Sequence, residues 1–217
     1  MKRIYLIMLM IAAMMVSCNP KDDDDNSNSG GGNGGGNGQY NGYEYVDLGL
    51  PSGKKWATCN VGASSPEDYG DYFAWGETSP KAEYTYENSI TYGEQMSDIS
   101  DSAQYDAATA NWGGIWRMPT KDEMQELVDY CEWEWTQVNG VSGSKVIGPN
   151  GSCIFLPAAG GRNGASLGYD GYNGYYWSSA PYGNDGNDAC ILLFGNGYES
   201  VDDSYRFNGL SVRPLTE

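Results

Sequence analysis

The sequence has no histidine and few basic residues. Its 217 residues include 12 Lys and Arg against 29 Asp and Glu, which gives a formal net charge of -17 at neutral pH. The absence of histidine excludes Ser–His and Cys–His nucleophile pairs and removes the most common metal ligand. Phosphate binding needs clustered Lys and Arg, and the sequence has no such cluster, so no nucleic-acid partner is expected.

The chain is rich in aromatic residues. It has 18 Tyr and 7 Trp in an otherwise polar composition. Tyrosine provides a large contact area at a low entropic cost, so this composition favours a binding surface. Pairs of carboxylates also remain available for hydrolytic chemistry, and the acidic stretch that contains Asp68, Asp71 and Glu77 is the candidate for it.

Residues 1–17 have the pattern of a bacterial lipoprotein signal peptide. Lys2 and Arg3 precede an apolar run, which is too short to cross a membrane comfortably as a helix. The run ends in Val-Ser-Cys, which looks like a lipobox. We therefore expect lipidation at Cys18 and a membrane partner reached through the lipid anchor.

Residues 18–42 are expected to connect this anchor to one folded domain. The acidic run that follows Lys21 resembles the export signal of Bacteroidota surface lipoproteins, which implies an outer-membrane protein that faces outwards. The Gly- and Asn-rich remainder has too few apolar residues for a core and predicts a flexible tether. The folded domain is expected to cover residues 43–217.

The domain is expected to belong to the α+β class, with two helices and several short strands. Thr120 and Glu123 have the spacing of a helix capping box. An apolar stripe at helical spacing follows, formed by Met124, Leu127, Val128 and Cys131. A shorter helix is predicted over residues 102–111, with Asp101 as its N-cap.

Apolar blocks alternate with polar stretches in the last quarter of the chain. The blocks 176–179, 189–194 and 210–214 are expected to form the scaffold. The stretches 163–173, 182–188 and 195–208 consist largely of Gly, Asn, Asp, Ser and Tyr, and are expected to be loops.

Several motifs resemble, in unbroken order over residues 44–215, the major paralogous domain of Fibrobacter and Bacteroidota surface proteins. They are Val46–Leu50, Trp56–Ala63, Pro66–Thr78, Trp112–Gly114, Trp116–Thr120, Ile154–Gly160, Tyr176–Ser179 and Ser211–Pro214. The resemblance implies a C-type lectin-like fold, with two helices packed on small antiparallel sheets. It also implies that the first and last strands pair, here Tyr45–Leu48 with Leu210–Pro214.

The sequence departs from the relatives of this fold whose chemistry is understood. The calcium-dependent sugar-binding motifs are missing, because Pro149-Asn150 follows a glycine and Trp177 is followed by two serines. The formylglycine-generating enzymes need a cysteine pair near the C-terminus, where only Cys190 occurs. No metal, cofactor or enzymatic activity is therefore expected.

The polar loops are the expected place for ligand contacts, with a glycan or a protein outside the cell as the ligand. Tyrosine rings can stack on sugars or anchor protein partners, and Asn and Asp supply hydrogen bonds. The loops are also similar to those that diversity-generating retroelements vary in some C-type lectin-like proteins. The candidate contacts are Tyr169, Tyr172, Asn173, Tyr182, Asn184, Asp185, Asn187, Tyr198, Asp202, Tyr205 and Asn208.

Four cysteines lie beyond Cys18, and they allow three disulfide pairings. An oxidising surface environment permits disulfides. The preferred pairing is Cys59–Cys131 with Cys153–Cys190, and buried free thiols are the alternative. Separately, the tripeptide around Ser102 resembles a short O-glycosylation motif of Bacteroidota.

Three functions are compatible with these features. The leading hypothesis is a surface-exposed, adhesin-like binding module. The second is a structural subunit or cap of a surface assembly, without a small ligand. The third is a carboxylate-based hydrolase that uses Asp68, Asp71 or Glu77.

Overall fold

The structure is a computed structural model that describes residues 37–217. The expected signal peptide, the lipidation site Cys18 and the acidic export signal lie outside the described residues. Strand β1 (Gly38–Tyr40) lies within the range 18–42 expected to be a tether. A strand is therefore present five residues before the expected domain start at Tyr43.

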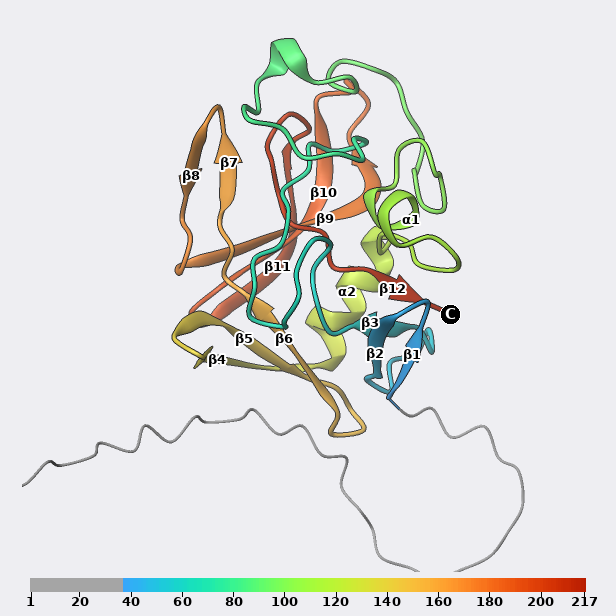
Figure 1. Ribbon diagram of the computed structural model, residues 1–217, viewed down its shortest axis with the longest axis vertical. Helices are drawn as coiled ribbons and strands as arrows, with labels where there is room; N and C mark the ends of the chain where they lie inside the picture. Colours follow the sequence, from blue (N-terminus) through green and yellow to red (C-terminus); the bar gives the residue numbers. More distant parts are fainter. Residues whose placement is uncertain (1–36) are drawn as a thin grey trace, which may run out of the picture.

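Small antiparallel sheets and two α-helices make up the described domain, which confirms the α+β class (Figure 1). The sheets have the strand orders β1-β2-β3-β12, β11-β10-β9, β4-β5-β6 and β7-β8. The remaining strands are β2 (Tyr43–Asp47), β3 (Lys55–Ala57), β4 (Glu132–Val138), β5 (Val141–Ile147), β6 (Cys153–Pro157), β7 (Gly161–Asn163), β8 (Ser166–Gly168), β9 (Asn173–Tyr182), β10 (Asp188–Gly195), β11 (Tyr198–Tyr205) and β12 (Leu215–Thr216).

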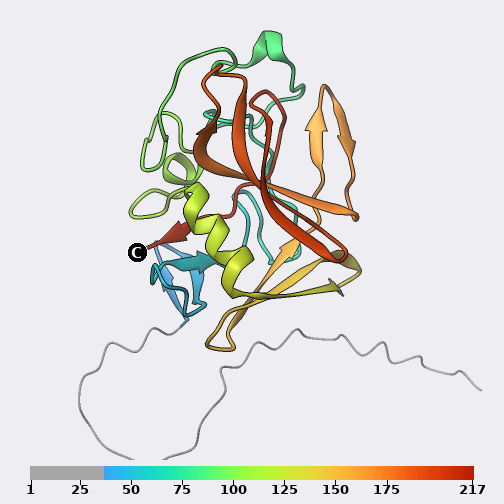
Figure 2. The same cartoon turned by 180° about the vertical axis from the view of Figure 1, so that it is seen from behind.

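Strand β10 is the centre of the core, because it pairs with β9 on one side and with β11 on the other. Successive side chains of a strand point to opposite faces. Ile191 accordingly packs with Trp177 and Phe73 in one hydrophobic cluster, whereas Leu192 packs with Tyr176 in a second. Helix α2 (Lys121–Tyr130) contacts all three strands of this sheet and lies across it in Figure 2.

The expected second helix is confirmed. The Thr120 hydroxyl accepts the backbone N–H of Glu123 at 3.3 Å, and the Glu123 carboxylate accepts the N–H of Thr120 at 2.8 Å. This reciprocal capping box satisfies two donors that a helix start leaves without partners. Met124 and Leu127 are buried, and Val128 packs against the same cluster.

The first helix begins five residues later than the sequence pattern predicts. Helix α1 covers Ala107–Trp112, and its N-cap is Asp106, whose carboxylate accepts the N–H of Thr109. Asp101, the expected cap, has a left-handed φ of 62° and lies in a preceding turn. The alanines favoured a longer helix, but the buried carboxylate of Asp106 sets the actual start.

The expected pairing of the first and last strands is wrong in detail. Strand β12 pairs with β3, through Leu215 opposite Trp56, and not with β2. The segment before it is buried but makes only isolated bridges, with Leu210 opposite Phe73 and Ser211 beside Tyr176. The two ends of the domain still lie on one small sheet, separated by β2 and β3.

The stretch 195–208 is not a loop, because most of it forms strand β11. Each residue from Tyr198 to Tyr205 is paired with a residue of β10. The stretch 163–173 likewise contains β8, whereas 183–187 is the expected turn between β9 and β10. Strand β11 lies at the edge of its sheet, where pairing with β10 holds it, and its side chains are half-buried or exposed.

The expected disulfide pairing is wrong. Cys59, Cys131 and Cys190 are free thiols in the structure, which excludes both expected bridges. Cys153 begins β6 and Cys190 lies in β10, and these strands belong to different sheets. Burial raises the pKa of Cys131 to about 12 and also raises the pKa of Cys190, so both thiols stay protonated and unreactive at neutral pH.

Alkylation tests this arrangement. We expect Cys59, Cys131 and Cys190 to react with iodoacetamide in denaturant without any reductant. In the folded protein, Cys131 and Cys190 should react more slowly than they do in a denatured control, because the thiolate is the reactive form. Peptide mass spectrometry reads out each site. A requirement for reductant at any of the three would contradict the structure.

Candidate functional site

A groove of about 270 Å³ lies between the β7–β8 hairpin and the β9–β11 sheet. Its size approaches the lower end of ordinary small-molecule sites. Residues of β7, β9 and β11 form its walls, and the segment that follows β11 lines it as well. The lining consists of Gly161, Arg162, Asn163, Tyr169, Tyr175, Ser204, Asn208 and Leu210.

Two tyrosine rings form the aromatic part of the groove. Tyr169 and Tyr175 meet edge to face, with ring centroids 6.3 Å apart. Tyr169 is 69% exposed and has a φ of 61°, whereas Tyr175 is half-buried and packs on the core. One ring is therefore fixed by the core, and the second presents most of its surface to solvent.

A chain of neutral hydrogen-bonding groups forms the polar part. The amide of Asn163 donates to the side-chain oxygen of Asn208 at 3.0 Å, and the Asn208 amide donates to the Ser204 hydroxyl at 3.0 Å. These bonds fix the orientation of both amides. The lining contains no carboxylate and no thiol, so it offers neither an acid–base pair nor a nucleophile of those kinds.

Arg162 is the one charged residue of the lining. Its guanidinium lies over the ring of Tyr72, 5.0 Å from the centroid, and donates to the carbonyl of Ala165. Burial raises the pKa of the Tyr72 hydroxyl, which donates to the carbonyl of Ala159 at 2.6 Å. The aromatic ring beneath Arg162 therefore stays neutral and holds the cation at the groove.

The eleven expected contact residues divide into two groups. Tyr169 and Asn208 line the groove, and Tyr172 lies in the same turn as Tyr169. Asn173 donates a hydrogen bond to the Tyr198 hydroxyl at the end of the sheet nearest that turn. Asp202 is exposed on β11, two residues from Ser204 of the groove and on the same face of the strand.

The second group lies at the end of the same sheet away from Asn173 and Tyr198, roughly 20 Å from those two residues along the strands. Tyr205 of this group also adjoins the groove, because its carbonyl accepts the N–H of Asn208. Asn184 and Asp185 are exposed in the β9–β10 turn, where Asn187 donates to the Asp185 carboxylate. Tyr182 and Tyr205 end the neighbouring strands, and both are paired with Asp188. The eleven residues therefore do not share one binding site.

Aromatic side chains from distant parts of the chain meet at this second end. Phe207 stacks on Tyr205 with centroids 5.3 Å apart, and it meets Tyr92 and Tyr86 edge to face. We call Tyr86, Tyr92, Tyr205 and Phe207 the distal aromatic cluster. Tyr86 belongs to η1 (Tyr86–Asn88), which lies at the top of Figure 1, whereas the β1–β2 hairpin lies at the bottom.

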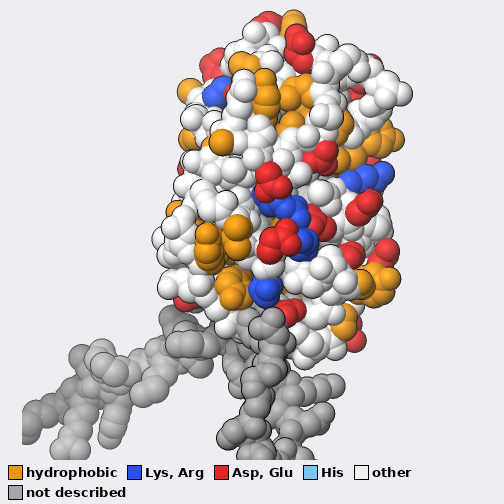
Figure 3. All heavy atoms as spheres, turned by 90° about the vertical axis from the view of Figure 1, so that its right-hand side faces the viewer, with side chains coloured by type: hydrophobic (Ala, Val, Ile, Leu, Met, Phe, Trp, Pro, Cys, Tyr) orange, Lys and Arg blue, Asp and Glu red, His pale blue; other side chains and the backbone are white. Residues whose placement is uncertain are grey.

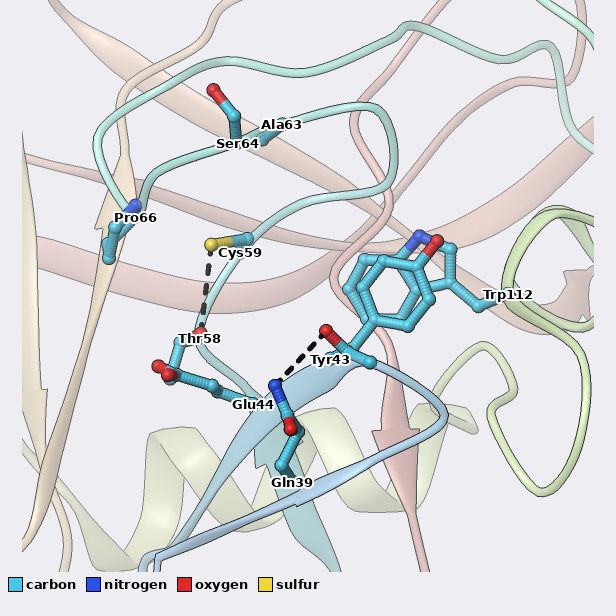
Figure 4. Close-up of a pocket in the computed structure, with 10 residues that line it drawn as sticks. Gln39, Tyr43, Glu44, Thr58, Cys59, Ala63, Ser64, Pro66 and Trp112 are labelled. Carbon is cyan, nitrogen blue, oxygen red and sulfur yellow. Dashed lines mark hydrogen bonds between the residues drawn. The ribbon is translucent and has the colours of Figure 1, made fainter.

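A second hollow of about 370 Å³ lies beside the β1–β2 hairpin (Figure 4). Its lining includes Gln39, Thr58 and the free thiol of Cys59. The rings of Tyr43 and Trp112 stack at 3.7 Å on its wall, so each ring covers one face of the other. Because each of these two rings has one face covered by the other, the hollow presents less free aromatic surface to a ligand than the groove does.

Two of the three carboxylates proposed for hydrolysis have local structural partners, and the third, Asp71, is exposed. Glu77 is buried, forms an ion pair with Lys81 at 2.9 Å and accepts the N–H of Ile90. Asp68 accepts bonds from Ser64 and Ser65 in its own turn. Across residues 37–217, no group of three Asp, Glu or Cys side chains could hold a metal ion.

Ser102, the expected glycosylation site, lies in the turn before α1. Its N–H donates to the carbonyl of Ile99, and its carbonyl accepts the N–H groups of Tyr105 and Asp106. The residue is half-buried, between the exposed Asp101 and Ala103. Nothing in its surroundings tests the modification, which stays a prediction.

Several residues of both surfaces were not expected from the sequence. In the groove they are Arg162, Asn163, Tyr175 and Ser204, and in the distal cluster they are Tyr86, Tyr92 and Phe207. Tyr86 and Tyr92 come from the irregular region 76–100, which has no periodic pattern. Only the spacing Tyr-x-Phe at 205–207 hinted at a surface aromatic pair.

None of the helices among the described residues is long and apolar enough to cross a membrane. Comparison with protein-family models, with curated proteins and with solved structures finds no match to this chain.

Proposed function

We propose that the protein is a binding module, and that the groove between the β7–β8 hairpin and β11 takes a neutral glycan. The observation that carries this proposal is the lining itself. Two tyrosine rings offer faces for a sugar ring, and the Asn163–Asn208–Ser204 chain offers both donors and acceptors. A net charge of -17 disfavours acidic sugars.

The lining favours binding over turnover. Glycoside hydrolysis ordinarily uses two carboxyl groups that flank the scissile bond. The eight lining residues include no Asp or Glu. The fixed amides also support recognition, because preorganised groups lower the entropic cost of binding.

The wider setting belongs to the same proposal. The lipobox at Cys18 and the acidic run after it support a lipid-anchored, surface-exposed adhesin-like protein. The α+β arrangement and the shared motifs support a C-type lectin-like fold of the major paralogous type. Variation of the C-terminal positions by a diversity-generating retroelement is part of the hypothesis, and a template repeat beside a reverse-transcriptase gene would be its signature.

A glycan array with the full chain tests the groove. For any neutral glycan that binds, we expect Tyr169→Ala to weaken binding about tenfold, because stacking of a sugar on one ring contributes on the order of 1 kcal/mol and a tenfold change corresponds to about 1.4 kcal/mol. Tyr172→Ala is the matched control, since Tyr172 is similarly exposed at 76% and does not line the groove. Titration calorimetry gives the dissociation constants.

Two results would count against the groove. Equal losses in the Tyr169 and Tyr172 variants would place the contact on the turn as a whole. Silence on broad neutral glycan panels, with an intact fold by circular dichroism, would leave the structural-subunit hypothesis as the better one.

A further inference from the structure

The distal aromatic cluster exposes more apolar surface than its place in the fold requires. Tyr86 is 60% exposed and Tyr205 is 53% exposed, and Ile90, which lies between Tyr86 and Tyr92 in the chain, is 64% exposed. Hydrophobic side chains also gather near the upper end of the molecule in the space-filling view (Figure 3). Contiguous exposed apolar patches on soluble domains commonly mark interaction sites.

The cluster is held rigidly from below. Arg206 is buried, lies 4.3 Å from the ring centroid of Trp75 and donates to the carbonyls of Thr91 and Glu94. The Thr91 hydroxyl donates to the carbonyl of Trp75 at 2.6 Å. These bonds fix the segment that carries Tyr92 against the turn that carries Phe207. The rings are therefore in place before any partner arrives.

Exposed carboxylates lie in the segment that carries Tyr86 and in the β9–β10 turn. A hydrogen bond from Tyr86 holds the pKa of Glu87 below its usual value, and bonds from Asn187 do the same for Asp185. Both carboxylates are exposed and ionised at neutral pH. Glu83, three residues from Tyr86, is exposed as well.

The basic side chains nearest to the cluster are already engaged. Lys81 pairs with Glu77 and donates to Asn88, and Arg206 is buried beneath the rings. The surface therefore combines free aromatic faces with negative charge and has no cation of its own. Lys and Arg bind aromatic faces through the ring quadrupole and bind carboxylates through charge-assisted hydrogen bonds.

We propose that the distal aromatic cluster is a docking site for a basic segment of another polypeptide. An Arg or Lys side chain of the partner stacks on the exposed ring of Tyr86 or Tyr205 and pairs with Glu87 or Asp185. A second position lies where Asp188 is flanked across the sheet by Tyr182 and Tyr205, whose side chains share its face.

The negative charge near the cluster favours a basic peptide over a sugar as its ligand. The cluster offers carboxylates and phenols, whereas the groove offers fixed neutral amides and an arginine. Acidic glycans would be repelled, and a neutral glycan would leave the surrounding carboxylates unused. The site also lies at the opposite end of the domain from Gly38, where the described chain begins (Figures 1 and 2).

The test uses the full chain, immobilised by its amino-terminal end, and a labelled peptide that alternates arginine with serine. We expect binding that weakens about tenfold in Tyr205→Ala and in Tyr86→Ala, since central aromatic anchors carry most of such binding energy. Glu87→Gln should weaken binding less and reduce its dependence on salt. The same peptide with citrulline in place of arginine should not bind measurably.

Tyr130→Ala is the matched control. Tyr130 is 54% exposed, close to the value for Tyr205, and it lies on α2 away from the cluster. Equal binding by wild type and all three tyrosine variants would show diffuse attraction to an acidic protein and would overturn the proposal. Binding of the citrulline peptide, failure of the arginine peptide to bind, or preferential binding of neutral oligosaccharides at these tyrosines would overturn it as well.

Discussion

Replacing Arg213 with methionine is expected to lower the free energy of unfolding by about 3–5 kcal/mol, because several buried acceptors are left unsatisfied, and this is a large fraction of the stability of a domain of this size. Arg213 is 1% exposed and has no carboxylate partner among residues 37–217. Its guanidinium donates instead to the side-chain oxygen of Asn60 at 2.8 Å and to the carbonyls of Ala57, Thr58 and Phe155 at 2.7–3.0 Å.

The size of this effect follows from what the substitution leaves behind. Methionine fills much of the volume but donates no hydrogen bond, so four buried acceptors lose a partner at once. Those acceptors belong to β3, to the segment after it and to β6. Arg213 therefore joins the end of the chain to β3, to the segment after β3 and to β6. Its loss weakens the attachment to each of these three segments.

Urea denaturation of both proteins measures the change in unfolding free energy. Lys145→Met is the control, because it removes a cation whose nearest carboxylate, Glu134, is 4.0 Å away and largely exposed. We expect that control to change stability by no more than about 0.5 kcal/mol. If the two variants lost similar stability, the hydrogen bonds of Arg213 would not be the cause.

The second large effect is expected for Glu123→Gln, which should cost about 3 kcal/mol at neutral pH. Glu123 accepts from both terminal nitrogens of Arg117, at 2.8 Å and 2.5 Å, and from the N–H of Thr120. The pair is buried, so the variant leaves the Arg117 cation without its counter-charge. It also weakens the capping box of α2.

The pH dependence of this difference identifies its source. Burial alone would raise the pKa of Glu123, but the bonds from Arg117 and Thr120 outweigh it and hold the pKa below its usual value. A lowered folded-state pKa adds stability above the unfolded value, near pH 4.3, and that stability is lost as the pH falls through the folded value. The gap between wild type and Glu123→Gln should therefore be constant above about pH 5 and shrink in acid.

The difference between wild type and Glu123→Gln is needed because a second buried carboxylate, Asp106, also makes stability depend on pH. Burial raises the pKa of Asp106, although N–H groups of Thr109 and Met118 oppose the shift. A raised carboxyl pKa acts with the opposite sign, so its contribution falls as the pH rises through the same range. Asp106 is present in both proteins and cancels in the difference. A gap that stayed constant down to pH 3 would show that Glu123 acts through shape alone.

Local sequence signals predicted local structure well. Helix α2 follows from the spacing of Thr120 and Glu123, because both partners of the capping box lie within one turn. Strand β10 and the buried part of β9 follow from continuous apolar runs. The buried roles of Arg117 and Arg213 were also predictable, because lone arginines within apolar motifs need internal partners.

Structure that depends on distant partners was not predictable in this way. Strand β11 is polar and does not alternate, and it exists because β10 offers a free edge beside it. The distal aromatic cluster joins Tyr86 and Tyr92 to Phe207, more than a hundred residues later in the chain. The groove likewise forms only because the β7–β8 hairpin packs beside β11. No sequence pattern in either segment predicts that the two are neighbours.

The small sheet β1-β2-β3-β12 determines how the domain responds to a pulling force. A load between the chain before Gly38 and a partner at the far end acts at the open end of the β1–β2 hairpin, where Gly38 faces Tyr45. The three residue pairs of this hairpin then separate one after another rather than together. Peeling should stop at the turn, which Trp116 and the Asn41–Trp112 hydrogen bond attach to the helical part of the domain. A few residues of extra length could thus be released under load while the core stays folded.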